Sequence, residues 1–170
     1  MNRNQYIKRM DRAQLVRDYV KLRTALKGAR VRLEAISEAF VVGKKKTGDR
    51  RFDKWGGAAL SAVLYLLNAE ASMEGIIQSL GKKERRGGQW AVMYTDKMFT
   101  SAIEELDNLP RGVIAMDSEY AQYEEHYKQA LQLDRQSQKI KRQLIIMSRL
   151  NGTYGIEYEK LMREKGKRKE

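Results

Sequence analysis

Apolar residues in the first part of the chain recur at intervals that alternate between four and three positions. Such spacing places side chains on one face of a helix and is typical of a coiled-coil seam held for more than three heptads. It predicts a helix of about 30 to 40 residues, or about 45 to 60 Å, that begins near Asn4 or at Asp11 and ends at Gly43. The seam consists of Leu15, Tyr19, Leu22, Leu26, Ala29, Leu33, Ile36 and Phe40.

Two further segments show the same periodicity. One predicts a helix from Ala58 to Leu80 that stops at Gly81, and the other predicts a helix from Gln89 to Leu106. The apolar surface around 64–67 is wider than one stripe, so we expect the first of these helices to be the most buried. Their apolar positions are Leu60, Val63, Leu64, Leu67, Met73, Ile76, Ile77 and Leu80, and then Trp90, Tyr94, Phe99, Ala102, Ile103 and Leu106.

A fourth helix is predicted from about Asp117 to Leu150, closing at 151–152, and a short fifth helix from Tyr154 to about Lys165. The fourth helix carries two seams offset by three residues. That offset indicates local overwinding or a handover from one partner helix to another. The seams are Met116, Tyr120, Tyr123, Tyr127 and Ala130, and then Leu133, Ser137, Ile140, Leu144 and Met147, while Tyr158 and Leu161 would face inward from the fifth helix.

Together these segments predict an all-α fold, an antiparallel helical bundle of four to five helices with two long, coiled-coil-like helices. The single proline agrees with this, because a sheet protein needs many more turn residues. At 170 residues the chain is expected to form a single helical domain over 1–170. The first seam is longer than the second and third helices can cover, so we expect self-association or another helical subunit as a partner.

The charge of the chain points to a class of partner. Lys and Arg number 34 against 22 Asp and Glu, a net charge of +12, which favours nucleic acid (DNA or RNA) over an acidic protein or a membrane surface. The longest apolar run, 58–67, is about half the length that crosses a bilayer, so no membrane partner is expected. The absence of cysteine and the polar residues 1–12 fit the cytoplasm or the inside of a virus particle.

Two basic, glycine-containing stretches, 44–57 and 82–88, are predicted as loops at opposite ends of the bundle. Lysine and arginine contact phosphates, and an exposed tryptophan stacks on bases. The competing interpretation is a solvated turn followed by a tryptophan buried as the first core residue of the next helix. The predicted nucleic-acid-binding residues here are Lys44, Lys45, Lys46, Arg50, Arg51, Lys54, Trp55, Lys82, Lys83, Arg85, Arg86 and Trp90.

The fourth helix and a basic tail at 166–170 add further candidates. Residues 135–156 have a net charge of +5 and contain no acid. In an up-and-down bundle the 82–88 loop would lie beside this segment, and we expect the two together to form the main site. Loops rather than the first helix would supply most contacts, because charges spread around a helix cannot all face one backbone. The remaining predicted residues are Lys139, Lys141, Arg142, Arg149, Lys167, Arg168 and Lys169.

Signals for catalysis are weak. His126 is the only histidine, which excludes histidine clusters for metal binding. The stretch 43–48 resembles a phosphate-binding loop, but Asp49 follows the second glycine where that motif requires lysine. Asp53 and Glu84 lie in predicted loops, whereas carboxylates that hold magnesium are usually fixed on a rigid element. The sequence therefore predicts a protein that is not an enzyme, with no cofactor, metal or small-molecule substrate.

Two functions from different classes remain. The first is non-catalytic, sequence-independent nucleic-acid binding within a larger nucleoprotein complex. The alternative is a helical structural or adaptor subunit of a large assembly such as a virus particle, with basic surfaces that dock on acidic partners. The segment 104–125, with a net charge of −6, favours the alternative, because it could receive the basic end of a neighbouring copy.

Overall fold

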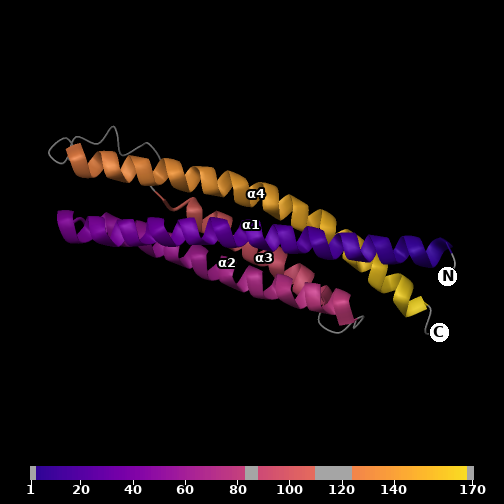
Figure 1. The fold of residues 1–170 in the computed structure, drawn as a ribbon. Helices are drawn as coiled ribbons and strands as arrows, with labels where there is room; N and C mark the ends of the chain where they lie inside the picture. The colour runs from indigo at the N-terminus through magenta and orange to yellow at the C-terminus, as the bar shows by residue number, and fades with distance from the viewer. Residues whose placement is uncertain (1–2, 83–87, 110–123, 168–170) are drawn as a thin grey trace.

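A computed structural model describes the backbone of residues 3–82, 88–109 and 124–167, and the side chains of 11–81, 90–109 and 128–163. Within these residues all regular secondary structure is helical (Figure 1), which confirms the predicted all-α class. The helices are α1 (Arg3–Thr47), α2 (Arg50–Lys82), α3 (Gly88–Leu106) and α4 (Glu124–Lys167).

The helices form an antiparallel four-helix bundle. Helix α1 packs on α2 and α4, and α3 packs on the same two helices, so the four make a closed ring. The two outer helices in the chain, α1 with 45 residues and α4 with 44, are the long ones. The N-terminal part of α1 and the C-terminal part of α4 project together past the turn end of α2 and α3 (Figure 1). The predicted bundle with two long helices is therefore confirmed.

The seam predicted for the first helix is the inner face of α1. All eight of its residues are buried, none more than 4% exposed. Burial of such a face against neighbouring helices, rather than helix propensity, supplies most of the stability of a helix in a bundle. The second seam predicted for the fourth helix, from Leu133 to Met147, is likewise buried. The first seam of that helix lies mostly outside the described side chains.

The predicted loop at 44–57 is wrong, because only two residues separate α1 from α2. Helix α1 continues through Gly43, where the ring of Phe52 lies so close that a Cβ would be 2.7 Å from its Cδ1 atom. The turn comes at Gly48, whose φ of +70° is readily adopted only by glycine. Asp49 then caps α2 by accepting a hydrogen bond from the Arg51 backbone N–H at 2.9 Å. Gly43 thus serves close packing rather than helix termination.

Helix α2 is rotated about its own axis relative to the prediction, so that a different face is buried. Its inner face is rich in alanine, with Ala59, Ala62 and Ala69 fully buried. Three leucines predicted to lie in the core point outward instead: Leu60 is 50% exposed, Leu64 54% and Leu67 40%. The inner face combines these small residues with large ones such as Leu66, Met73 and Ile76, and the three leucines fall on the opposite side of the helix. Among the described residues α2 nevertheless has the largest share of buried positions, 13 of 32 over 50–81, which confirms the expectation that this helix is the most buried.

The break predicted at 151–152 is also wrong, because α4 runs without interruption to Lys167 and includes the expected fifth helix. Asn151 is fully buried rather than exposed at a helix end. Gly155 lies against Val92 of α3, and a Cβ there would be 2.7 Å from the Val92 Cγ1 atom. Residues that often end helices are used here for packing inside the bundle. Tyr158 is buried as expected, and Leu161 is partly buried.

The core consists of two apolar clusters with polar side chains near their boundary. The smaller cluster, at the end where α1 and α4 project, contains Tyr19 and Tyr158 with Leu15, Ile76, Leu80 and Met162. Near the boundary the Ser72 and Thr95 hydroxyls hydrogen-bond to each other. Because Val92 faces Gly155 in antiparallel helices, Asn151 lies at about the level of Thr95. The carboxamide of Asn151 has no hydrogen-bond partner among the described residues.

Candidate nucleic-acid interface

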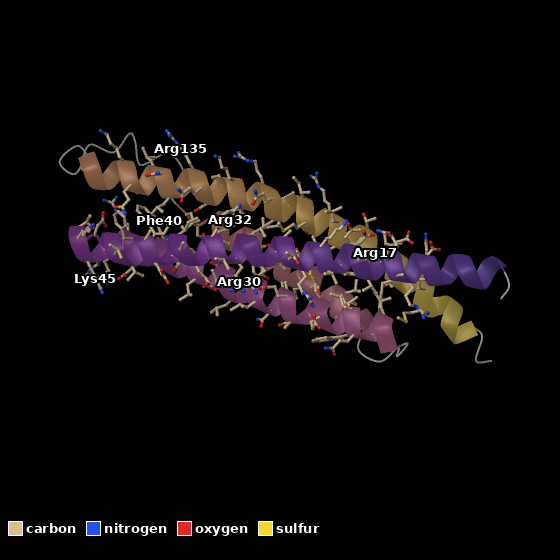
Figure 2. The ribbon with its side chains drawn as sticks, in the orientation of Figure 1. Arg17, Arg30, Arg32, Phe40, Lys45 and Arg135 are labelled. Carbon is tan, nitrogen blue, oxygen red and sulfur yellow. The ribbon has the colours of Figure 1, made fainter. Side chains whose placement is uncertain are left out.

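The outer face of α4 carries a stripe of basic residues. The α4 stripe consists of Lys128, Arg135, Lys139, Arg142 and Arg149, all exposed. Their spacings of seven, four, three and seven keep them on one side of the helix, opposite the buried seam from Leu133 to Met147. Figure 2 shows Arg135 and other nitrogen-tipped side chains on the side of α4 that faces away from the other helices.

The α4 stripe is long, and no described carboxylate neutralises it. From Lys128 to Arg149 it extends about 32 Å, close to one turn of a DNA duplex. The ion pairs formed among the described residues leave out all five of its cations. The segment 135–156 contains no acidic residue. Such a row of exposed cations, none of them paired with a described residue, is suited to a partner with regularly spaced negative charges.

Helix α1 divides its basic residues between two sides. On the side toward α2, Arg23 pairs with Glu74, and Arg30 pairs with Glu70 and Glu34. The hydrogen bond from Arg30 to Glu70 is the main reason why the pKa of Arg30 is raised. The pairs with Glu74 and Glu70 therefore link α1 to α2 within the bundle. The basic residues on the side toward α4 are exposed and include Lys21 and Arg32.

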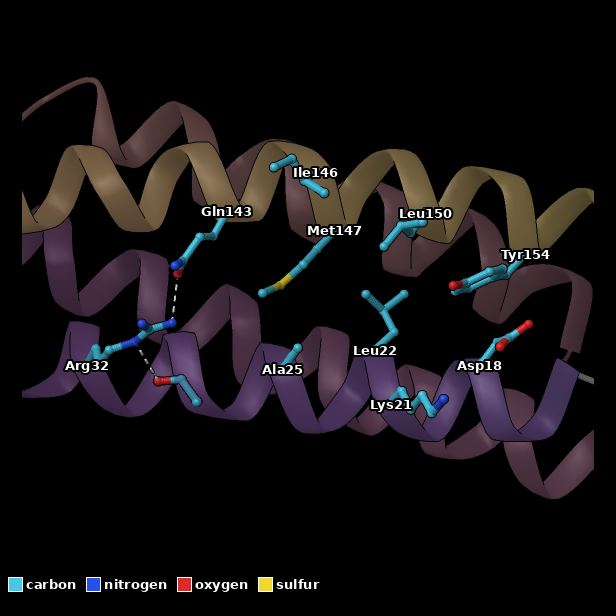
Figure 3. Close-up of a pocket in the computed structure, with 11 residues that line it drawn as sticks. Asp18, Lys21, Leu22, Ala25, Arg32, Gln143, Ile146, Met147, Leu150 and Tyr154 are labelled. Carbon is cyan, nitrogen blue, oxygen red and sulfur yellow. Dashed lines mark hydrogen bonds between the residues drawn. The ribbon is translucent and has the colours of Figure 1, made fainter. Parts of the chain in front are cut away.

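Lys21 and Arg32 border a cleft of about 580 Å³ between α1 and α4. Figure 3 shows Leu22 and Met147 facing each other between the two helices, with Asp18 and Tyr154 at one end. Arg32 crosses the cleft by donating a hydrogen bond from Nη2 to Gln143 Oε1 at 2.7 Å. Burial first, and then the neighbouring Asp18 carboxylate, raises the pKa of Tyr154. The cleft thus has an apolar floor and a rim that holds two further cations beside α4.

The residues predicted in the 44–57 stretch have unequal surroundings. Lys44 pairs with Asp53, and Arg51 pairs with Asp49. Trp55 is only 7% exposed and packs against Phe40 and Phe52, with ring centroids 5.9 and 5.2 Å away, so it cannot stack on a base. The four predicted residues at this end that are exposed and form no ion pair with a described residue are Lys45, Lys46, Arg50 and Lys54.

The structure describes only part of the second predicted cluster and of the tail. Lys82 and Lys167 end α2 and α4, and their side chains lie outside the described set. Trp90 is 70% exposed, and its ring stacks on Tyr94 with centroids 5.3 Å apart. The predicted residues that lie outside the described backbone are Lys83, Arg85, Arg86, Arg168 and Lys169.

The expected grouping of the 82–88 loop with 139–149 stays a prediction, because residues 83–87 lie outside the described backbone. The start of α3, next to that loop, packs beside Gly155, whereas Lys141 pairs with Asp107 beyond the other end of α3. The length of α3, 19 residues or about 28 Å, therefore separates the first residues of α3 from the level of 139–142. Arg149 lies between these levels along α4.

The sequence prediction missed Lys128 and Arg135, and it included Lys141, which points toward α3. The signal for the full stripe was present in the sequence. Outward positions on α4 alternate by four and three just as the buried seam does, and the basic residues fall on them. The positions opposite the buried seam include Lys139 and Arg142 but not Lys141. Helical periodicity, rather than the local run of basic residues, would therefore have separated Lys141 from the other two.

Other kinds of site find less support among the described residues. No group of three or more His, Asp or Glu side chains in the described part of the chain is placed to hold a metal ion. Over Arg50–Gly81, α2 is long and apolar enough to cross a membrane by length and composition, with 33% of its most apolar window buried. The apolar character of α2 thus extends beyond the run at 58–67. One face of this helix packs on α1 and α3.

Comparisons with protein-family models, curated proteins and solved structures find no match to this chain. Its function is therefore inferred from the charge and geometry of its own residues.

Proposed function

We propose that this protein binds nucleic acid without sequence preference through the α4 stripe, assisted by Lys21 and Arg32 of α1. The observation that carries the proposal is the stripe itself, five exposed cations on one side of a rigid helix with no described carboxylate partner. Neutralising phosphates with such residues releases condensed counterions, which supplies most of the free energy of non-specific binding.

The arrangement favours backbone contact over base readout. Proteins that read a groove insert a helix or ribbon into it and present a few side chains to the base edges. The inner face of α4 is buried in the bundle, and five of the eight exposed side chains over 128–149 are long, flexible cations, the others being Gln132, Gln136 and Ile146. Such side chains position a phosphate backbone but carry no sequence information of their own.

The proposal shifts the main contact from the loops to α4. At the α1–α2 turn, two of the predicted cations are already neutralised by Asp49 and Asp53. The remaining four, Lys45, Lys46, Arg50 and Lys54, make a matched set for comparison, because replacing them removes the same charge from another place.

The experiment compares two variants with four substitutions each. The first variant carries Arg135→Gln, Lys139→Gln, Arg142→Gln and Arg149→Gln. The second carries Lys45→Gln, Lys46→Gln, Arg50→Gln and Lys54→Gln. Fluorescence anisotropy with a labelled duplex and a labelled single strand, each of mixed sequence, gives affinity between about 50 and 250 mM salt. For duplex, the first variant should flatten the slope of log K against log salt by about three to four units, at about 0.9 per lost contact. The second should flatten it by about one unit or less.

Equal losses from both variants would mean that net charge alone, rather than the α4 stripe, determines binding. A wild-type chain that binds neither probe at low salt would overturn the proposal. The interpretation as a structural or adaptor subunit would then replace it.

A further inference from the structure

The cleft between α1 and α4 has an apolar interior. Its volume of about 580 Å³ is in the range of sites that bind organic ligands. Leu22 and Met147 form its floor, and the exposed side chains of Ile146 and Leu150 form its wall on α4. Among the described residues that line the cleft, Asp18 is the only acid, and it lies at one end (Figure 3). The interior is therefore suited to an apolar group.

The wall on α1 consists of small residues. Ala25 is exposed and points toward α4 in Figure 3, and Gly28 follows it by three residues. Glycine inside a helix is less stable than alanine and is often used where another group must approach closely. A Cβ added at Gly28 would meet no atom within 4 Å, so no described residue of the chain makes such an approach. The space beside Gly28 is available to a group from another molecule.

The cleft opens directly onto the α4 stripe. The stripe has a gap of seven residues between Arg142 and Arg149, and Ile146 occupies the position between them, four residues after one and three before the other. Ile146 therefore lies on the line of the stripe and also on the wall of the cleft. A polyanion that follows the stripe passes the opening of the cleft at this point.

The opposite rim, on α1, also carries cations. Arg32 donates a hydrogen bond from Nε to the Gly28 carbonyl at 3.3 Å and one from Nη2 to Gln143 Oε1 at 2.7 Å. Both acceptors are uncharged, and Arg32 forms no ion pair with a described residue, so its charge is held in place without being neutralised. Lys21 is exposed and lies eleven residues earlier, about 16 Å away along α1. Cations thus border the apolar interior on both sides.

We propose that this cleft receives the bases of a single-stranded nucleic acid whose phosphates follow the α4 stripe and reach Arg32 and Lys21 across the cleft. The assignment rests on the function proposed above and specifies the form of nucleic acid that the same surface prefers. A single strand combines a row of negative charges with unpaired bases, which matches the cationic rims and the interior between them.

The arrangement favours this ligand over two others. In a duplex the bases are paired inside, so only the rims would make contact. A ligand with a single charged head would use one cation, whereas the rims present several on both helices. Isoleucine, leucine and methionine side chains contact the faces of bases in proteins that unstack nucleic acids. Ile146, Leu150 and Met147 are residues of these types.

The test separates the bases from the phosphates. Labelled oligothymidylate and a labelled abasic strand of the same length and backbone are titrated with the wild-type protein in about 50 mM salt, and fluorescence anisotropy gives both affinities. Oligothymidylate should bind at least about fivefold more tightly, because contacts to bases add to the same phosphate contacts.

Two pairs of substitutions locate the difference. Ala25→Gln with Ile146→Gln narrows the cleft and removes part of its apolar wall while every cation stays. Ala35→Gln with Ile156→Gln is the matched control, because it changes the same residue types at exposed positions that do not line the cleft. The first pair should abolish the difference between the two strands and leave the affinity for the abasic strand unchanged. The control pair should keep the difference, and circular dichroism checks that both are folded.

Equal affinity of the wild-type protein for the two strands would overturn the proposal, as would the same loss of preference in both pairs. If both strands still bind and the four substitutions in the α4 stripe still weaken them, the function proposed above stands without this inference. A wild-type protein that binds neither strand overturns both. Myristate that binds the wild type but not the first pair, with the two strands bound equally, would assign the cleft to a fatty acid instead.

Discussion

The outer faces of α2 and α4 follow the same periodicity and differ in chemistry. Helix α4 shows cations outward and large apolar residues such as Leu144 inward, whereas α2 shows leucines outward and alanines such as Ala62 inward. On α4 the contrast between polar and apolar positions identifies the buried face. On α2 both faces are apolar, so the size of the side chains and the closeness of the neighbours decide which face is buried.

The contrast between the two faces of α2 predicts the largest stability effect. Leu66→Ala removes a fully buried side chain and should lower the free energy of unfolding by about 2–5 kcal/mol. Leu64→Ala, at a residue 54% exposed, should cost less than about 1 kcal/mol in the monomer. Urea unfolding at low protein concentration measures both. Similar losses for the two would break the assignment of inner and outer faces.

On α4, two glycines three residues apart also differ in how closely they are packed: Gly155 lies against α3, whereas Gly152 has no neighbouring atom within 4 Å of an added Cβ. Gly155→Ala sets a Cβ 2.7 Å from the Val92 Cγ1 atom, and because valine is short and stiff, we expect a loss of about 1–3 kcal/mol. Gly152→Ala meets no atom within 4 Å and should stabilise the helix by up to about 1 kcal/mol. Thermal unfolding of the two variants should therefore shift in opposite directions. A shift in the same direction would contradict the packing of α3 on α4.

A buried tyrosine on the inner face of α1 predicts a dependence of stability on alkaline pH. Burial above all, and then the nearby Tyr158 and Glu159, raises the pKa of Tyr19, so the folded state keeps this phenol neutral. The unfolded phenol ionises near pH 10. The stabilisation is therefore fully present below that pH and is lost as pH rises above it.

Tyr19→Phe tests this dependence directly. The Tyr19 hydroxyl has no hydrogen-bond partner among the described residues, so at pH 7 the variant should differ from wild type by about 1 kcal/mol or less. Its urea midpoint should fall less than that of wild type between pH 8 and pH 11. Parallel losses in both proteins would place the alkaline sensitivity elsewhere, for example in Tyr158, whose pKa burial also raises.

The smallest effect is expected from the α4 stripe. Arg142→Gln or Arg149→Gln should change the free energy of unfolding by no more than about 0.5 kcal/mol, because neither cation is paired with a described residue. The same changes should weaken nucleic-acid binding. Lys141→Gln is the comparison, since it breaks the pair with Asp107 and affects stability rather than binding. Equal stability losses at 141 and 142 would erase the distinction between the two positions.

Periodicity in the sequence predicted much of the fold. The α1 seam, the seam from Leu133 to Met147 and the bounds of α3 could all be predicted, because strong alternation of apolar and polar residues decides them. The helix ends at Gly43 and at 151–152 could not, because a glycine that ends a helix and one that admits a neighbouring ring look alike in sequence. The difference lies in Phe52 and in the bundle around Asn151, which are tertiary facts.

The candidate site was predicted less completely, for a related reason. Lys139, Arg142 and Arg149 were identified from the local excess of positive charge. Whether a lysine is free depends on carboxylates that may be distant in sequence, as Asp107 is from Lys141. The burial of Trp55 likewise depends on Phe40 of another helix. Composition therefore predicts the class of partner, and the three-dimensional fold selects the residues that remain available to it.

The ring order of the bundle has a consequence for how many molecules the protein can join. Helices α2 and α4 are diagonal, each packing on both α1 and α3, so their outer faces point in opposite directions. A ligand on one face leaves the other accessible, and the two occupancies do not compete for space.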